Sequence, residues 1–96
     1  MATLNDQVVL FGGGNGADLG DTWVWDGSTW TELTIAGPAA RGGTAATAWN
    51  GNIVLFGGEA GGVYQSDTWT FDGSAWTAQT ATGPLARANA SMGVAP

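Results

Sequence analysis

The sequence contains no cysteine and no histidine, and its only basic residues are Arg41 and Arg87. The chain therefore lacks disulfides, thiolate nucleophiles, imidazole bases and the ligands of ordinary zinc sites. Eight acidic residues give a net charge of −6. This charge argues against nucleic-acid binding, in which Lys and Arg neutralise phosphates, and against an anionic membrane surface. We therefore expect neither nucleic acid nor membrane as a partner.

Long apolar runs are also missing. No stretch of the sequence approaches the roughly 18 apolar residues of a membrane span. The first residues lack the basic segment followed by a long apolar one that marks a signal peptide. The sequence therefore predicts a soluble protein whose compartment is not indicated. Its 96 residues suit one small domain with a modest core.

Glycine, with 17 residues, and tryptophan, with six, are abundant, and both recur at a fixed period. The run VVLFGG at 8–13 returns as IVLFGG at 53–58, which is 45 residues later. Residues 21–41 return at 67–87, 46 residues later, with 13 of 21 positions identical. Such self-similarity predicts two tandem copies of one structural unit. The change of offset falls in the loop after the glycine pair, where a change of length is tolerated.

Each copy is predicted to form a meander of four short strands. The first is the small-residue run at 44–49 in the second copy, which a tight turn at 50–51 follows. The runs at 8–11 and 53–56 are apolar and rich in β-branched residues, and a glycine pair ends each of them. Alternating aromatic and smaller residues follow at 22–25 and 68–71, as is typical of strands. An Asp-Gly turn and a strand that opens with tryptophan come next. No segment has a helical period, so the chain is expected to be all-β.

This pattern resembles the kelch repeat. The residues that carry the resemblance are the glycine pairs, the aromatic residues of the third strand and the tryptophan of the fourth: Gly12, Gly13, Gly57, Gly58, Trp23, Trp25, Trp69, Phe71, Trp30 and Trp76. The resemblance covers nearly the whole chain and implies two four-stranded blades of a β-propeller. The third strand carries Trp or Phe where the family often has Tyr. Such a resemblance indicates a fold but little about function.

The resemblance divides the chain into a first blade at 1–41, with a partial first strand, and a second blade at 42–87. Residues 88–96 are expected to form the first strand of a following blade and to complete a blade of a neighbouring chain. A propeller has about four to eight blades, so two must be closed by oligomerisation. Three chains would give six blades, a common number in the family, and four would give eight. We therefore expect a homotrimer, with a homotetramer as the alternative.

The repeated tryptophans are interpreted as core residues that fill the gap between blades, and a sugar-stacking surface is the alternative. Trp49 has no aromatic counterpart at Ala95. It is therefore the tryptophan expected to be exposed, and the candidate ligand contact. Arg41 and Arg87 occupy equivalent positions, and each is expected to bind a carboxylate or loop carbonyls between blades. An anion site facing the central channel is the alternative for these two residues.

Three further sequence features resemble ligand-binding or metal-binding sites, but the residues around them do not complete such a site. Residues 12–17 fit a dinucleotide-binding fingerprint, but no helix is predicted to follow. Residues 13–21 approach a calcium-binding nonapeptide that does not repeat every nine residues. Asp21 and Asp67 are interpreted as acceptors of loop N–H groups, with a cation on the ring axis as the alternative. We therefore predict no catalytic, cofactor-binding or metal-binding residues.

Three functions are consistent with this interpretation. The first is a non-enzymatic, self-assembling β-propeller fragment, natural or engineered, that acts as a scaffold or protein-interaction module. The second is a lectin-like or other ligand-binding propeller that uses the loops at 14–20 and 59–66 together with Trp49. The third is a piece of a kelch-containing enzyme. Copper radical oxidases of that kind need His, Cys and Tyr ligands, whereas this chain has only Tyr64.

Overall fold

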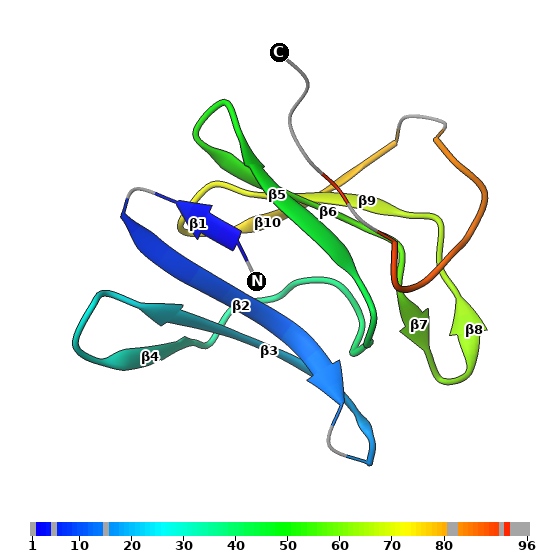
Figure 1. The fold of residues 1–96 in the computed structure, drawn as a ribbon, viewed down its shortest axis with the longest axis horizontal. Helices are drawn as coiled ribbons and strands as arrows, with labels where there is room; N and C mark the ends of the chain where they lie inside the picture. The colour runs from blue at the N-terminus through cyan, green and yellow to red at the C-terminus, as the bar shows by residue number, and fades with distance from the viewer. Residues whose placement is uncertain (1, 5, 15, 81–82, 91, 93–96) are drawn as a thin grey trace.

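The computed structural model describes residues 2–4, 6–14, 16–80, 83–90 and 92. All regular elements in these residues are β-strands, and all strand pairs are antiparallel (Figure 1). The all-β prediction is thus confirmed. Two four-stranded sheets account for most of the strands, and a two-stranded hairpin forms the rest. The described part of the chain contains no helix of a length and apolarity sufficient to cross a membrane.

The first sheet is a meander in which each strand pairs with the next one along the chain. Its strands are β1 (Ala2–Leu4), β2 (Gln7–Gly14), β3 (Asp18–Trp25) and β4 (Trp30–Leu33). Asp26 closes the turn between the last two of these strands. Its carboxylate accepts hydrogen bonds from the backbone N–H groups of Thr29 and Ser28, and these bonds lower the pKa of Asp26.

The second sheet repeats this meander. Its strands are β5 (Ala45–Trp49), β6 (Asn52–Phe56), β9 (Thr68–Phe71) and β10 (Trp76–Gln79). Asp72 closes the last turn as Asp26 does, with hydrogen bonds from the N–H groups of Ser74 and Ala75 that lower its pKa. A separate hairpin follows β6 in the chain and is formed by β7 (Glu59–Ala60) and β8 (Val63–Tyr64). The repeat in the sequence is therefore also a repeat of strand order.

The two sheets share one strand register. Leu10 lies opposite Trp23 in the first sheet, and the equivalent Leu55 lies opposite Trp69 in the second. The last two strands of each sheet also correspond, because the aromatic residue that ends the third strand lies opposite the tryptophan that opens the fourth. These pairs are Trp25 with Trp30, and Phe71 with Trp76. Equivalent residues therefore occupy equivalent places, and the two sheets can be compared position by position.

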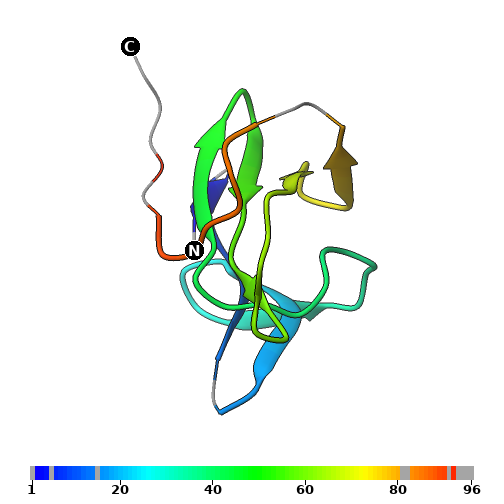
Figure 2. The same ribbon diagram turned by 90° about the vertical axis from the view of Figure 1, so that its right-hand side faces the viewer.

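The first-strand position of the first sheet is occupied by the chain's own N-terminal residues. In β1, Ala2 lies opposite Val9, as Thr47 lies opposite Val54 in β5. Residues 88–96 were expected to form a further first strand, but positions 91 and 93–96 lie outside the described residues. The described segment 83–90 runs back along the second sheet, close to β5 and β6 (Figures 1 and 2).

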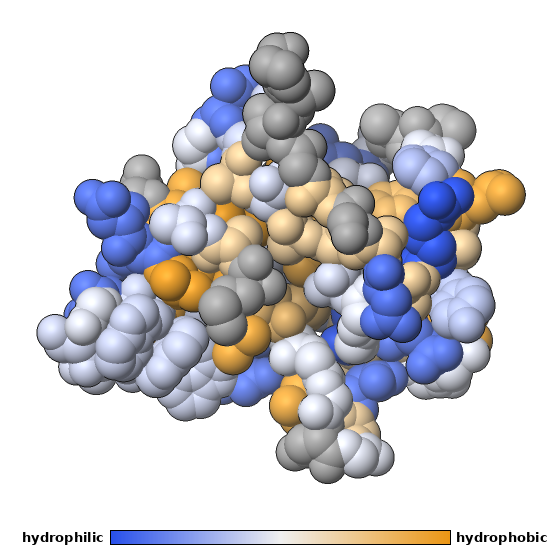
Figure 3. All heavy atoms as spheres, in the orientation of Figure 1, coloured by the Kyte–Doolittle hydropathy of each residue, from blue (hydrophilic) through white to orange (hydrophobic). Residues whose placement is uncertain are grey.

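The core lies between the two sheets, which pack face to face. Its buried members come from both sheets and are Leu4, Val9, Phe11, Ile53, Leu55, Phe71 and Trp76. Burial of one such side chain contributes about 1.5–3 kcal/mol. On the face drawn in Figure 3, apolar residues gather across the middle, over β1 and β5, and polar residues lie around the rim.

Side chains alternate along each strand, so each sheet has an inner face toward the other sheet and an outer face away from it. In β2, Val9 is buried on the inner face, whereas its neighbours Val8 and Leu10 are only half-buried on the outer face. The outer face of the first sheet carries Val8, Leu10, Trp23, Trp25 and Trp30. The outer face of the second sheet carries Trp49, Val54, Phe56 and Thr68.

Candidate functional site

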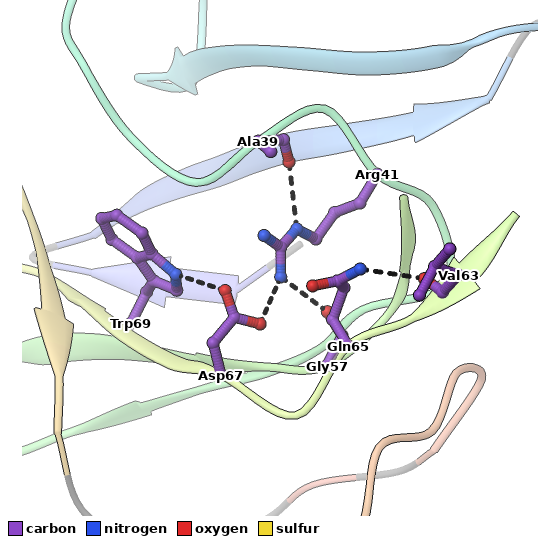
Figure 4. A network of polar contacts seen from close by, with 7 residues as sticks. All are labelled: Ala39, Arg41, Gly57, Val63, Gln65, Asp67 and Trp69. Carbon is purple, nitrogen blue, oxygen red and sulfur yellow. Dashed lines mark hydrogen bonds and ion pairs between the residues drawn. The ribbon is translucent and has the colours of Figure 1, made fainter. Parts of the chain in front are cut away.

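A buried arginine joins the two sheets. Arg41 lies in the connection between them and is only 2% exposed. Its Nη1 donates hydrogen bonds to Asp67 Oδ1 at 2.6 Å and to the Gly57 carbonyl at 3.2 Å (Figure 4). Its Nε donates to the Ala39 carbonyl at 3.0 Å. One guanidinium thus binds its own loop and two segments of the second sheet, through both a carboxylate and loop carbonyls.

Asp67 receives a second donor on its other oxygen. The indole Nε1 of Trp69 donates to Asp67 Oδ2 at 2.8 Å. Partial burial opposes ionisation of this carboxyl group, but the hydrogen bonds from Arg41 and Trp69 and the charge of Arg41 outweigh it. The pKa of Asp67 is therefore lowered. Arg41 and Asp67 form an ion pair, and loss of either partner would leave the other without its counter-charge.

The glycine pairs allow the loop that carries the arginine to approach the sheet. Gly12 has a φ of +67°, and a Cβ there would lie 2.6 Å from the Arg41 carbonyl oxygen. The N–H of Gly13 donates to that oxygen at 2.9 Å. Any other residue at position 12 would collide with the loop and strain the backbone. The same arrangement recurs in the second unit, where the residues are Gly57, Gly58 and Arg87.

A buried tryptophan forms the apolar half of the contact. Trp76 is 8% exposed and its ring lies edge-on to Phe11, with centroids 5.3 Å apart. Its Nε1 donates to Thr22 Oγ1 of the first sheet at 3.0 Å. A Cβ at Gly37 would lie 2.7 Å from Trp76 Cδ1. Phe11, Thr22 and Gly37 of the first unit therefore form a socket for a tryptophan of the second.

Backbone contacts complete the interface between the units. Gly42 and Glu59 exchange two hydrogen bonds, of 3.0 and 2.8 Å. The N–H of Gly61 donates to the carboxylate of Asp18 at 2.8 Å. The interface thus combines an ion pair, an inserted indole ring and a short backbone ladder, which together fix one orientation of the second sheet on the first.

The equivalents of Trp76 and Arg41 lie on the two outer faces, where they are more exposed. Trp30 is equivalent to Trp76 and is 41% exposed, and Arg87 is equivalent to the buried Arg41 and is exposed. Asp21 is equivalent to Asp67 and accepts the indole N–H of Trp23 at 2.6 Å. The second outer face and its flanking loop supply the equivalents of the socket residues, which are Phe56, Thr68 and Gly83. Both halves of the contact are therefore present twice.

Trp49 is 54% exposed at the end of β5. It is not the only exposed tryptophan among the described residues, because Trp30, which the sequence places in the core, is 41% exposed in the single chain. The counterpart of Trp49 in the first sheet is Leu4, because each lies opposite the residue that opens the next strand. Leu4 is 5% exposed and belongs to the core. Trp49 is thus exposed at the place where its counterpart Leu4 packs between the two sheets.

Several interface residues were not singled out from the sequence, among them Thr22 and Gly37. The available signal was their identity with Thr68 and Gly83 in the second copy. The two equivalent aspartates were interpreted as acceptors of loop N–H groups. They instead accept indole N–H groups, and one of them also binds arginine. Within the described ranges, no three metal-ligating side chains lie close enough together to hold an ion.

Comparison of the chain with protein-family models gives no match, and comparison with curated proteins gives none either.

Proposed function

We propose that the chain is a non-enzymatic, self-assembling β-propeller unit that acts as a scaffold or protein-interaction module. The two sheets are then its blades, at 1–41 and 42–87, and further copies complete the ring. One observation carries this proposal. The described residues make the contact that joins the two sheets once, whereas its residue types recur on the two outer faces.

The outer faces also supply a driving force. Trp30 and Trp49 are 41% and 54% exposed on opposite outer faces. Exposed apolar patches of this kind mark interaction sites, and burial of apolar area contributes about 25 cal/mol per Å². A second copy that docks as the second sheet docks on the first would cover both faces in a head-to-tail arrangement.

Head-to-tail contacts form a ring when the rotation between units closes. We favour a homotrimer of six blades on the resemblance to kelch propellers, with a homotetramer of eight as the alternative. Residues 88–96 are proposed to pair with a blade of the neighbouring chain. That pairing competes with the chain's own β1, whose three residues occupy the first-strand position of the first sheet.

Sedimentation equilibrium of the purified chain tests the proposal. We expect a concentration-independent mass of three chains over the micromolar range. A mass of four chains would keep the proposal and correct the number of blades. A monomer throughout this range would contradict it.

A ligand-binding propeller is the second candidate. A pocket of about 230 Å³ adjoins the β7–β8 hairpin and is lined in part by Glu59, Tyr64 and Asn89. Tyr64 is 60% exposed, and an exposed aromatic ring beside polar groups suits a sugar. A glycan array would favour this function if binding is lost in both Tyr64→Ala and Trp49→Ala. If the wild-type chain binds no glycan on the array, a glycan-binding function is excluded.

A further inference from the structure

A pocket of about 300 Å³ lies on the outer face of the second sheet and is lined in part by Phe56, Thr68, Pro84 and Arg87. We propose that it is a socket for Trp30 of a second copy of this chain, locked by an ion pair between Arg87 and Asp21 of that copy. This inference rests on the proposed self-assembly and names the contact that produces it.

Two residues of the pocket, Phe56 and Thr68, correspond to residues of the site that Trp76 fills within the chain. Ala90 and Met92 also line the pocket, in which Phe56 is 6% exposed. Phe56 and Thr68 are the equivalents of Phe11, which meets the edge of the Trp76 ring, and of Thr22, whose hydroxyl accepts its indole N–H. The loop beside the pocket also keeps the required glycine. Among the described residues, a Cβ at Gly83 would meet only Phe56, at 3.8 Å, whereas a Cβ at Gly37 would lie 2.7 Å from Trp76.

The Trp30 side chain packs on its own sheet as the Trp76 side chain does. Its ring packs on Trp25 at a centroid distance of 5.4 Å, as that of Trp76 packs on Phe71 at 4.9 Å, and both pairs are tilted. Trp30 is 41% exposed on the first outer face. In the socket its Nε1 would donate to Thr68 Oγ1, and its ring would meet Phe56 edge-on. A largely desolvated tryptophan is the residue type that most often dominates an interface.

The two residues of the proposed ion pair, Arg87 and Asp21, are also oriented as their equivalents are within the chain. Arg87 Nε donates to the Leu85 carbonyl at 3.0 Å, as Arg41 Nε does to the Ala39 carbonyl at the same distance. Asp21 is oriented by the indole of Trp23, which binds its Oδ2 at 2.6 Å. The equivalent Asp67 binds tryptophan through Oδ2 and arginine through Oδ1. Oδ1 of Asp21 is thus the atom that Arg87 of the other copy would bind.

Trp30→Ala and Thr68→Val test the knob and the socket separately, because each lies on a different outer face. We expect each to raise the dissociation constant between chains, by at least about tenfold for Trp30→Ala and by about threefold to tenfold for Thr68→Val. These values follow from hot-spot tryptophans and from single hydrogen bonds. Tyr64→Ala removes a more exposed aromatic ring, 60% against 41% for Trp30, from the β7–β8 hairpin and should leave the constant unchanged.

Charge reversal tests the lock. Arg87→Asp alone should weaken assembly, because the introduced carboxylate would then face Asp21 of the next copy. The double variant Arg87→Asp with Asp21→Arg should restore it, because opposite charges meet again at every contact. Circular dichroism of each variant checks that the strands remain folded.

The outcomes separate the inference from the proposed function. If the wild-type chain is monomeric, both fail. If the wild-type chain assembles but Trp30→Ala, Thr68→Val and Arg87→Asp bind as tightly as Tyr64→Ala, self-assembly stands and this socket is wrong. Weakening by Trp30→Ala and Thr68→Val together with rescue by charge exchange supports the inference. Weakening by Arg87→Asp without rescue by the double variant contradicts the ion pair.

Discussion

Trp76 and Trp30 occupy the same position in two units of the same strand order, yet they are 8% and 41% exposed. Arg41 and Arg87 differ in the same direction. The local strands, turns and loops around each pair are alike, so the difference comes from what lies across the face. The repeated sequence thus supplies the residue types of this contact twice, and the described residues make the contact once. Equivalent substitutions should therefore have unequal effects on the fold of a single chain.

The largest inequality is expected for the two tryptophans. Trp76→Ala removes a buried ring and its hydrogen bond to Thr22, and should lower the free energy of unfolding by about 3–5 kcal/mol. Trp30→Ala at the exposed position should cost less than about 1 kcal/mol. Urea unfolding at a dilution where the chain is monomeric measures both. Equal losses would show that the inner and outer faces are not distinct in the way described.

The second-largest difference in the free energy of unfolding is expected between the two arginines. Arg41→Ala leaves Asp67 without its counter-charge and two carbonyl groups without their donor. We expect a loss of about 3 kcal/mol, at the lower end for a broken buried pair because the Asp67 side chain is 35% exposed. Arg87→Ala should change the unfolding free energy of the monomer by less than about 0.5 kcal/mol. The same urea titrations measure both losses, and a large loss for Arg87→Ala would mean that this arginine has a partner within the single chain besides the Leu85 carbonyl.

Gly37 and Gly83, the two glycines that precede proline, allow the inner and outer faces to be compared through the space around an added methyl group. An alanine Cβ at Gly37 would lie 2.7 Å from Trp76, and the same atom at Gly83 would have its nearest neighbour among the described residues at 3.8 Å. Gly37→Ala should therefore lower the melting temperature of the monomer, with a cost of about 1–3 kcal/mol for the overpacked ring. Gly83→Ala should leave the monomer almost unchanged. Differential scanning calorimetry of both variants gives the answer.

The smallest effect is expected from acid. The pKa of Asp67 is lower in the folded chain than the ordinary value of about 3.9. Its stabilising contribution is therefore present in full above that unfolded-state value and is lost as the pH falls through the folded-state value. The unfolding free energy should decline below about pH 4, and that of Asp67→Asn should decline less steeply. Identical slopes for the two proteins would mean that the carboxylate has no special partner.

Much of the fold could be predicted because its signals are local. The glycine pairs, the Asp-Gly turns and the alternating aromatic residues each act within a few positions, and they indicate strands, stops and strand order. The asymmetry between Arg41 and Arg87 could not be predicted in this way. It depends on which sheet lies opposite, and that is a property of packing between segments distant in the chain. In the sequence, Arg41 and Arg87 occupy equivalent positions of the two repeats, and that equivalence does not indicate which of them is buried.

The partners within the interface were missed for a similar reason. Thr22 is an ordinary strand residue until Trp76, 54 positions away, donates to its hydroxyl. The pairing of β1 with its own sheet also depended on packing, because both ends of the chain match the same first-strand position. Identity between the repeats was the one sequence signal that marked Thr22 and Gly37, and it cannot say which partner an identical residue meets.

If the outer faces repeat the inner contact between separate chains, removal of one exposed ring should disperse the assembly. A native mass spectrum of the wild-type protein, recorded beside Trp30→Ala at the same micromolar concentration, measures this directly. We predict a closed assembly of three chains, or of four, for the wild type and a monomer as the main species for the variant. A wild-type monomer, or an assembly that Trp30→Ala leaves intact, would show that the outer faces do not make this contact.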